Sequence, residues 1–218
     1  MLYLDKIELQ LRIMKIHPIN FKIDHNEIIL RSPELSEAGL LLTYFQNLFH
    51  ESSIFMQHES NFYDDKIVAD QERFLNLFNG SDKSFVIAAF LGPEIVGHII
   101  VDSFGFTRTG HRAKLVMGVL NKMQHQGLGS QLLKLAIEQS EATNTHSLEL
   151  QVKSFNAPAI RLYDKFDFER IGSIPAAACI DGEYSDEHIY QRLSLSLKSI
   201  LESQRSSSHA PRVKSGFF

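Results

Sequence analysis

Two glycines, Gly127 and Gly129, constrain the fold of this chain more than any other feature, because they separate a strand-like segment from an amphipathic one. Residues 111–120 read as a strand, and residues 127–142 carry apolar side chains at helical spacing. A glycine loop that opens a helix leaves main-chain N–H groups unpaired at the positive end of the helix dipole. Since glycine has no Cβ, a phosphate group can approach the main chain closely. The segment therefore predicts a site for a phosphate-bearing ligand.

The spacing of this loop excludes two common phosphate-binding motifs. A Walker P-loop has Lys and then Ser or Thr directly after its second glycine, whereas Ser130 and Gln131 follow here. The dinucleotide fingerprint has a third glycine where this chain has Leu132. On this motif alone, an ordinary strand-to-helix turn that contains glycines remains the alternative.

A second motif lies at residues 156–168, after a strand predicted at residues 147–152. Asn156 is placed to cap a helix, and Pro158 lies in its first turn, where the missing N–H has no cost. Together the motifs resemble the GNAT superfamily of N-acetyltransferases, which has a Gln/Arg-x-x-Gly-x-Gly/Ala loop followed by Asn-x-x-Ala-x-x-Leu-Tyr-x-Lys-x-Gly-Phe. The chain departs from the family at Asp167, which stands in place of glycine, and we expect it to adopt the left-handed conformation. The resemblance covers about residues 27–197.

The order of the elements predicts an α/β fold with a mixed, mostly antiparallel central sheet and helices on both faces, as the resemblance also implies. We expect a helix that begins with Ser32 as N-cap and Pro33 at its first position and ends near residue 50. Further helices are expected at residues 66–78, 127–142 and 156–166. Strands are expected at residues 27–31, 85–91, 94–101, 111–120, 147–152, 169–177 and 187–197.

Three parts are expected along the chain. Residues 1–26 form an N-terminal extension with an added strand at 7–13, which extends the sheet or pairs with a partner, as in a homodimer. Residues 27–198 form the acetyltransferase-like domain, and residues 199–218 form a serine-rich tail that we expect to be mobile.

The resemblance implies that acetyl-CoA is the co-substrate and that the glycine loop holds its diphosphate. Asn156 is expected either to cap its helix or to bind the pantetheine. The residues that the resemblance assigns to the cofactor are Gly118, Val119, Leu120, Gln124, His125, Gln126, Gly127, Leu128, Gly129, Ser130, Asn156, Ala159 and Tyr163.

Tyr163 is the candidate general acid, because a phenol with a pKa of about 10 is protonated at neutral pH and can supply the proton for a leaving thiolate. Glu149, Asp102 and His111 are candidates for the base that accepts the proton of the acceptor amine. Cys179 lies away from both motifs, which favours direct attack in a ternary complex over a covalent acyl-cysteine.

Composition restricts the remaining functions. The net charge is −4 with no broad basic stripe, which argues against nucleic-acid binding. The longest apolar run, residues 85–91, is too short to span a membrane, and the charged N-terminus does not resemble a signal peptide. The single cysteine fits a cytoplasmic protein. The histidines lack the His-x-x-x-His spacing, so the sequence predicts no metal site.

The sequence therefore predicts an N-acetyltransferase that acts on a primary amine of a small molecule or amino acid. Acetylation of a protein N-terminus or lysine is one alternative, and a non-catalytic acyl-CoA-binding module is another. Residues 51–56 and 181–186 are expected to determine the acceptor.

Overall fold

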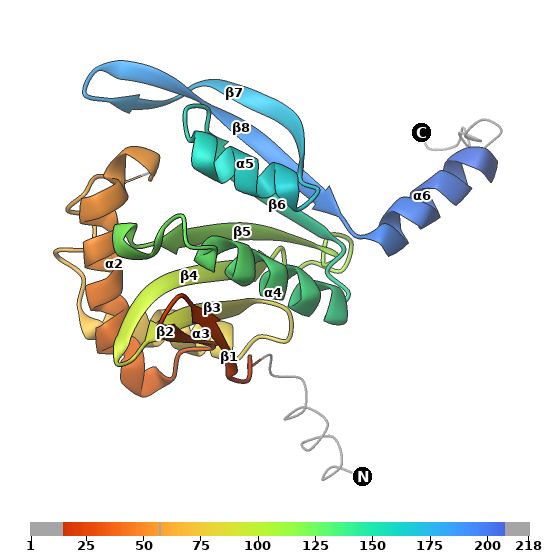
Figure 1. Ribbon diagram of the computed structural model, residues 1–218. Coiled ribbons are helices and arrows are strands. Elements are labelled where there is room, and N and C mark those ends of the chain that lie inside the picture. Colours follow the sequence, from red (N-terminus) through yellow and green to blue (C-terminus); the bar gives the residue numbers. More distant parts are fainter. Residues whose placement is uncertain (1–14, 57, 208–218) are drawn as a thin grey trace, which may run out of the picture.

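The computed structural model describes residues 15–56 and 58–207, which form a mixed sheet with helices packed against it (Figure 1). The strands are β1 (Ile19–Ile23), β2 (Asn26–Arg31), β3 (Phe85–Leu91), β4 (Glu94–Ser103), β5 (Arg112–Val119), β6 (Ser147–Lys153), β7 (Glu169–Ile180) and β8 (Glu183–Leu193). The α-helices are α2 (Ala38–Ser52), α3 (Val68–Asn79), α4 (Leu128–Ala142), α5 (Ala157–Lys165) and α6 (Leu195–Ser207). Short 3₁₀ turns are η1 (Leu35–Glu37), η2 (Ser53–Phe55) and η3 (Asn121–Met123).

The strands lie in the order β1-β2-β3-β4-β5-β6-β8-β7. Neighbouring strands are antiparallel except β5 and β6, which are parallel. That parallel ladder covers Arg112–Lys114 on β5 and Ser147–Glu149 on β6, and the rest of each strand lies outside it. The sheet therefore opens between β5 and β6 toward the carboxyl ends of both strands.

Helices cover both faces of the sheet, and two adjacent residues of β4 show which helix covers which face. The Gly97 backbone lies against Leu128 and Leu132 of α4, whereas the His98 side chain is bonded to Tyr44 of α2. Consecutive residues of a strand point to opposite faces, so α4 and α2 lie on opposite sides. The ring of Phe74 in α3 contacts α2, and α5 lies beside α4 (Figure 1).

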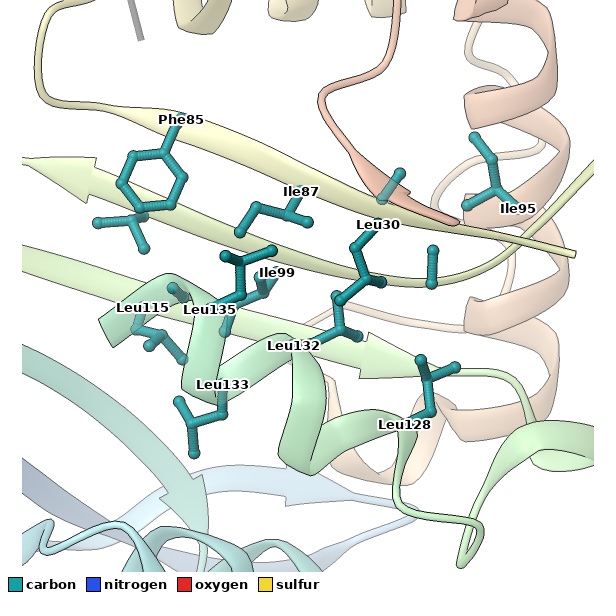
Figure 2. Close-up of a cluster of buried hydrophobic side chains, with 14 of the residues drawn as sticks. Leu30, Phe85, Ile87, Ile95, Ile99, Leu115, Leu128, Leu132, Leu133 and Leu135 are labelled. Carbon is teal, nitrogen blue, oxygen red and sulfur yellow. The ribbon is translucent and has the colours of Figure 1, made fainter. Parts of the chain in front are cut away.

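The main core lies between α4 and the sheet (Figure 2). Leu128, Leu132 and Leu135 follow one another at helical spacing along α4 and are almost fully buried. They face strands such as β3, which is buried on both faces from Phe85 to Phe90. Burial of each such side chain contributes about 1.5–3 kcal/mol, so this face of α4 holds the helix start in a fixed place.

Most of the predicted elements, and the fold class, are confirmed. Asp181 and Gly182 form the turn of the last hairpin with φ of +51° and +84°, as predicted. The hairpin is longer at its tip than expected, and β8 ends at Leu193 rather than 197.

The expected helix start at Ser32 is wrong. The buried Ser32 hydroxyl accepts the N–H of Ile16 at 3.0 Å and donates to the carbonyl of Val86 at 3.0 Å. A Ser-Pro pair serves a turn as well as a helix start, and here long-range partners use the hydroxyl. The first helical turn is η1, and its Glu37 carboxylate accepts the N–H of Glu34 at 2.7 Å.

The structure describes part of the expected N-terminal extension and part of the expected C-terminal tail. The predicted strand at 7–13 lies outside the described residues, but β1, within the expected extension, pairs with β2 and joins the sheet. The first part of the expected tail is helical, since residues 199–207 belong to α6, which ends at Ser207. Within the described part of the chain, no helix combines the length and apolar character needed to cross a membrane.

Candidate functional site

The glycine loop connects β5 to α4 through η3. Gly127 is the N-cap of α4 and has φ of +87°, a conformation that favours glycine. A Cβ added to Gly127 would meet no atom within 4 Å, so the space above it is open. His125 also has a positive φ, +59°, which turns the chain toward the start of the helix.

The main-chain N–H groups of residues 125–130 are the distinctive feature of this loop. Among the described residues, none of these six amides has an acceptor in hydrogen-bonding geometry, whereas the next N–H, of Gln131, donates to the carbonyl of Gly127 at 3.2 Å. The loop thus gathers unpaired donors at the positive end of the α4 dipole. Such a site favours an anion with several oxygen atoms.

Gly129 has a different role from Gly127. A Cβ there would lie 3.3 Å from Leu162 of α5 and 3.4 Å from Met117 of β5. The missing side chain therefore lets the first turn of α4 lie close to both elements. This contact brings α5, with Tyr163 next to Leu162, to the side of the loop.

The end of β5 presents a free edge toward the opening in the sheet. The N–H of Leu120 donates to the carbonyl of Val96 on β4 at 3.0 Å. Because main-chain groups alternate in direction along a strand, Gly118 also faces β4, whereas Val119 and Met117 face the side from which β6 has diverged. Of the three β5 residues predicted to pair with a cofactor, Val119 therefore has its main-chain groups directed into the opening.

Tyr163 is 7% exposed, and its ring packs against Phe168 and Tyr190 with centroids 5.8 Å and 6.3 Å away. Burial raises the pKa of the Tyr163 phenol above its ordinary value of 10, so it remains protonated at neutral pH. Its hydroxyl makes no hydrogen bond to any other described residue. The phenol is therefore a proton donor that no neighbour uses.

The second motif folds as predicted at both ends of α5. The Asn156 side chain caps the helix by accepting the N–H of Ala159 at 3.2 Å, which is one of the two roles expected for it. Asp167 has φ of +61°, which confirms that it adopts the left-handed conformation in place of glycine. The N–H of Phe168 then donates to the carbonyl of Tyr163 at 3.1 Å and closes the helix end.

The three candidates for the base lie at the closed end of the sheet. Asp102 pairs in register with Lys114, and His111 directly precedes β5. Glu149 accepts two hydrogen bonds from Arg112, at 2.6 and 2.9 Å. Lys114 is five residues from the end of β5, a distance of about 17 Å along a strand, and the closed end is thus separated from the glycine loop.

The bidentate contact makes Glu149 a poor base. Burial opposes ionisation of this carboxyl, but the hydrogen bonds and positive charge of Arg112 outweigh burial and lower its pKa. A carboxylate held this way has little tendency to accept a further proton. The Glu149 carboxylate is therefore engaged by Arg112 rather than available to an acceptor amine.

Two contacts at the opposite, open end were not predicted from the sequence. The rings of Phe55, in η2, and Phe155, after β6, lie 5.7 Å apart and join segments on the two sides of the opening. Lys153 and Glu187 form an ion pair of 2.8 Å whose side chains are only 2% and 9% exposed. Lys153 continues the alternation of Glu149 and Gln151 along β6, which gives no local signal that it is buried, and its partner lies 34 residues away.

Within the described ranges, no three His, Cys, Asp or Glu side chains gather as metal ligands would. The predicted acceptor segments both lie toward the same side of the view in Figure 1: Glu51 and Phe55 end the α2 region, and residues 181–186 form the tip of the β7–β8 hairpin. The Glu51 carboxylate accepts the N–H of Asn121 at 2.8 Å, so it contacts the chain that leads into the glycine loop.

Comparison with known proteins agrees with this geometry. Residues 45–168 match the model of the acetyltransferase (GNAT) family. The L-amino acid N-acetyltransferase AaaT of Escherichia coli (strain K12) is 31% identical over 108 residues, which are 49% of this chain and 67% of that protein.

Solved structures with the same fold include an acetyltransferase of the GNAT family from Streptococcus pneumoniae, with a TM-score of 0.72 and 28% identity over 76% of this chain and 99% of that one. Another is yncA, a putative acetyltransferase from Salmonella typhimurium solved with its cofactor acetyl-CoA, with a TM-score of 0.63 and 17% identity over 76% and 93% of the two chains. The family match spans more than half of the chain and includes both motifs. The chain therefore belongs to the GNAT family of acetyltransferases.

Proposed function

We propose that this protein transfers the acetyl group of acetyl-CoA to the primary amine of a small molecule, with an amino acid as the preferred class of acceptor. The observation that carries this proposal is the run of six unpaired amides at residues 125–130, beside a free strand edge and a buried tyrosine. The chain's 31% identity to an L-amino acid N-acetyltransferase supports the acceptor class.

The amides of residues 125–130 are assigned to the diphosphate. They fit this group because they are consecutive, unpaired and open above Gly127. The free edge of β5 at Met117 is assigned to the pantetheine amides, which would pair with it as an added strand does. The Val119 carbonyl already accepts a hydrogen bond from Gln124, so only the N–H of Val119 is available at this edge. The side-chain oxygen of Asn156 already accepts a hydrogen bond at the start of α5, so we assign Asn156 to the helix cap and not to the pantetheine.

The chemistry assigned to the protein is acid assistance and charge stabilisation. The acceptor ammonium first loses one proton to water, and the free amine nitrogen then bonds to the thioester carbon. As the carbon–sulfur bond breaks, Tyr163 gives its phenolic proton to the thiolate sulfur, and the extra proton on the acylated nitrogen leaves through water and restores the phenol. Burial raises the pKa of Tyr163, but the same surroundings also raise the basicity of a desolvated thiolate, so the transfer remains feasible. The N–H of Val119 is the donor that we assign to the thioester oxygen.

The acceptor is assigned to the side of the opening that α2 and η2 border. Glu51 and Phe55 come from this side, and Phe155 meets Phe55 across it. Phe55 is 37% and Phe155 is 46% exposed, so both rings remain available to an apolar part of an acceptor.

The deciding experiment measures release of free CoA thiol from acetyl-CoA in the presence of single amino acids, polyamines and peptides with free N-termini. We expect turnover with one or more amino acids and none with peptides. Turnover confined to peptides would mean that the acceptor is a peptide amine rather than a free amino acid. Binding of acetyl-CoA without turnover on any amine would favour a non-catalytic binding module.

A further inference from the structure

A stripe of three residues on α2 contacts the chain segment that links the free edge of β5 to the glycine loop. Tyr44, Leu48 and Glu51 are spaced four and three residues apart, so they share one face of the helix. We infer that this stripe, here called the α2 clamp, sets the position of residues 118–121 and thereby of the acetyl donor. The inference rests on the proposed function.

The first contact of the clamp is a buried hydrogen-bond chain. The Tyr44 hydroxyl donates to the carbonyl of Gly118 at 2.9 Å and lies 2.7 Å from Nδ1 of His98. A phenol has one proton to donate. Because Tyr44 donates that proton to the Gly118 carbonyl, its oxygen accepts the Nδ1–H of His98. Tyr44 and His98 are 2% and 3% exposed, which shields both bonds from competing water.

Burial determines the protonation states of His98 and Tyr44 in this series of hydrogen bonds. Burial lowers the pKa of His98 to about 3, so the ring is neutral at physiological pH and has one N–H to give. Burial and the nearby Glu51 charge raise the pKa of Tyr44 well above 10, so its proton stays in place. At neutral pH the hydrogen bonds therefore have one direction: His98 donates to Tyr44, and Tyr44 donates to the carbonyl of Gly118.

The second contact is steric. A Cβ on Gly118 would lie 2.5 Å from the end of the Leu48 side chain, closer than real Cβ atoms approach a neighbour, and 3.1 Å from the His98 ring. The side chain of Leu48 therefore packs directly against the backbone of Gly118. The requirement for glycine at position 118 comes from this contact with α2.

The third contact extends the clamp beyond the end of β5. The Glu51 carboxylate accepts the N–H of Asn121, the first residue of η3, at 2.8 Å. This N–H begins a turn and has no partner within it. Clamp contacts thus occur at residues 118 and 121, on either side of Val119, whose own carbonyl is held by Gln124.

This arrangement gives the clamp a positioning role. At this point β5 has separated from β6, so on that side no neighbouring strand holds it in register. A small displacement of residues 118–121 would move the free edge of Val119 and the amides of the glycine loop relative to Tyr163. Acyl transfer is sensitive to such displacements, because the reacting groups must be held within a fraction of an ångström.

Two variants with matched controls test the clamp. Tyr44→Phe removes the hydroxyl, whereas Tyr63→Phe is a control, because the Tyr63 ring packs on Phe45 but its hydroxyl does not bond to β5. Glu51→Ala removes the acceptor for Asn121, whereas Glu51→Gln keeps an oxygen that can accept the same N–H.

The first measurement is hydrogen exchange of the peptide covering residues 115–124 without any ligand. We expect about tenfold faster exchange in Tyr44→Phe and Glu51→Ala than in wild type, with exchange at residues 147–153 unchanged. Glu51→Gln and Tyr63→Phe should match wild type. This measurement holds whether or not the protein acetylates an amine, and unchanged exchange in both clamp variants would overturn the inference.

The second measurement separates positioning from stability. At saturating acceptor, Tyr44→Phe and Glu51→Ala should lower kcat about tenfold and weaken acetyl-CoA binding, with Glu51→Gln restoring acetyl-CoA binding. A clamp that is only structural would lower the melting temperature and leave kcat, KM and acetyl-CoA affinity unchanged in the folded fraction, which also contradicts the inference. If wild type itself does not bind acetyl-CoA, the proposed function fails while the exchange result still decides the clamp.

Discussion

The side-chain amide of Gln124 donates hydrogen bonds from Nε2 to the carbonyl oxygen of Val119 at 2.9 Å and to Oδ1 of Asn121 at 3.0 Å. The first residue of the glycine loop is therefore tied back to the last residue of β5. This contact fixes the separation between the strand edge and the unpaired amides, which together form the proposed donor site.

The glycine loop is tested first by substitution at Gly127. Gly127→Asp should abolish the rise in melting temperature that acetyl-CoA produces in wild type, because it adds bulk and negative charge beside the diphosphate. Gly182→Asp is the matched control, since Gly182 also has a positive φ and open space but lies in the hairpin turn. Both variants should lose about 1 kcal/mol of stability from backbone strain, and only the first should lose the ligand effect. An intact shift in Gly127→Asp would place the diphosphate elsewhere.

Removal of the Tyr163 hydroxyl tests the general acid. Tyr163→Phe should lower kcat on the order of a hundredfold while acetyl-CoA affinity changes little. Its free energy of unfolding should stay near that of wild type, because the hydroxyl has no hydrogen bond to other described residues. Tyr190→Phe, in the neighbouring ring, is the control. Steady-state kinetics with both substrates varied provide the measurement, and an unchanged kcat would remove the acid role from Tyr163.

The buried pair of Lys153 and Glu187 should contribute to stability only as a pair. Lys153→Met leaves a carboxylate without its partner in a buried place and should cost about 3–5 kcal/mol in urea unfolding. The double variant Lys153→Met/Glu187→Leu should recover most of that loss. Lys122→Met, in an exposed pair with Glu94, should cost less than about 1 kcal/mol. A Lys153→Met variant as stable as Lys122→Met would contradict this expectation.

Acid destabilisation should depend on His98. Its folded-state pKa, about 3, lies below the ordinary value of 6.5, so between these values the unfolded chain binds more protons. The free energy of unfolding should therefore be level above pH 7 and fall as the pH drops below 6.5, by about 1 kcal/mol per pH unit from this group. His98→Gln should flatten this part of the curve, and His25→Gln, at an exposed turn, controls for loss of one histidine. Chemical unfolding from pH 5 to 8 measures both, and equal slopes in wild type and His98→Gln would refute the assignment.

The elements that could be predicted from the sequence are those whose information is local. Residues 85–91 are a continuous apolar run, which predicts a buried strand, and the β3 boundaries match the prediction. The capping role of Asn156 and the left-handed Asp167 are also local, since the partner lies three residues away or in the same turn. Ser32 shows the limit: its hydroxyl partners lie 16 and 54 residues away.

The candidate site divides in the same way. The motif could indicate the glycine loop, because its donors belong to the backbone of one segment. It could not show that Glu149 is engaged by Arg112, since their contact depends on the parallel register of β5 and β6. Nor could it show the contacts of Tyr44 with Gly118, which require α2 to pack on β4 in one particular rotation.

The short ladder between β5 and β6 has a mechanical consequence. In the described part of the chain, the β5–β6 ladder has three residue pairs, ending at Lys114 and Glu149, and the His111 carbonyl before β5 also accepts the N–H groups of His146 and Ser147. Under a pulling force applied across β5 and β6, these few rungs would be the first to shear. A molecule lying lengthwise between the strands would fasten the two halves together, and the force needed to part them would rise with its occupancy.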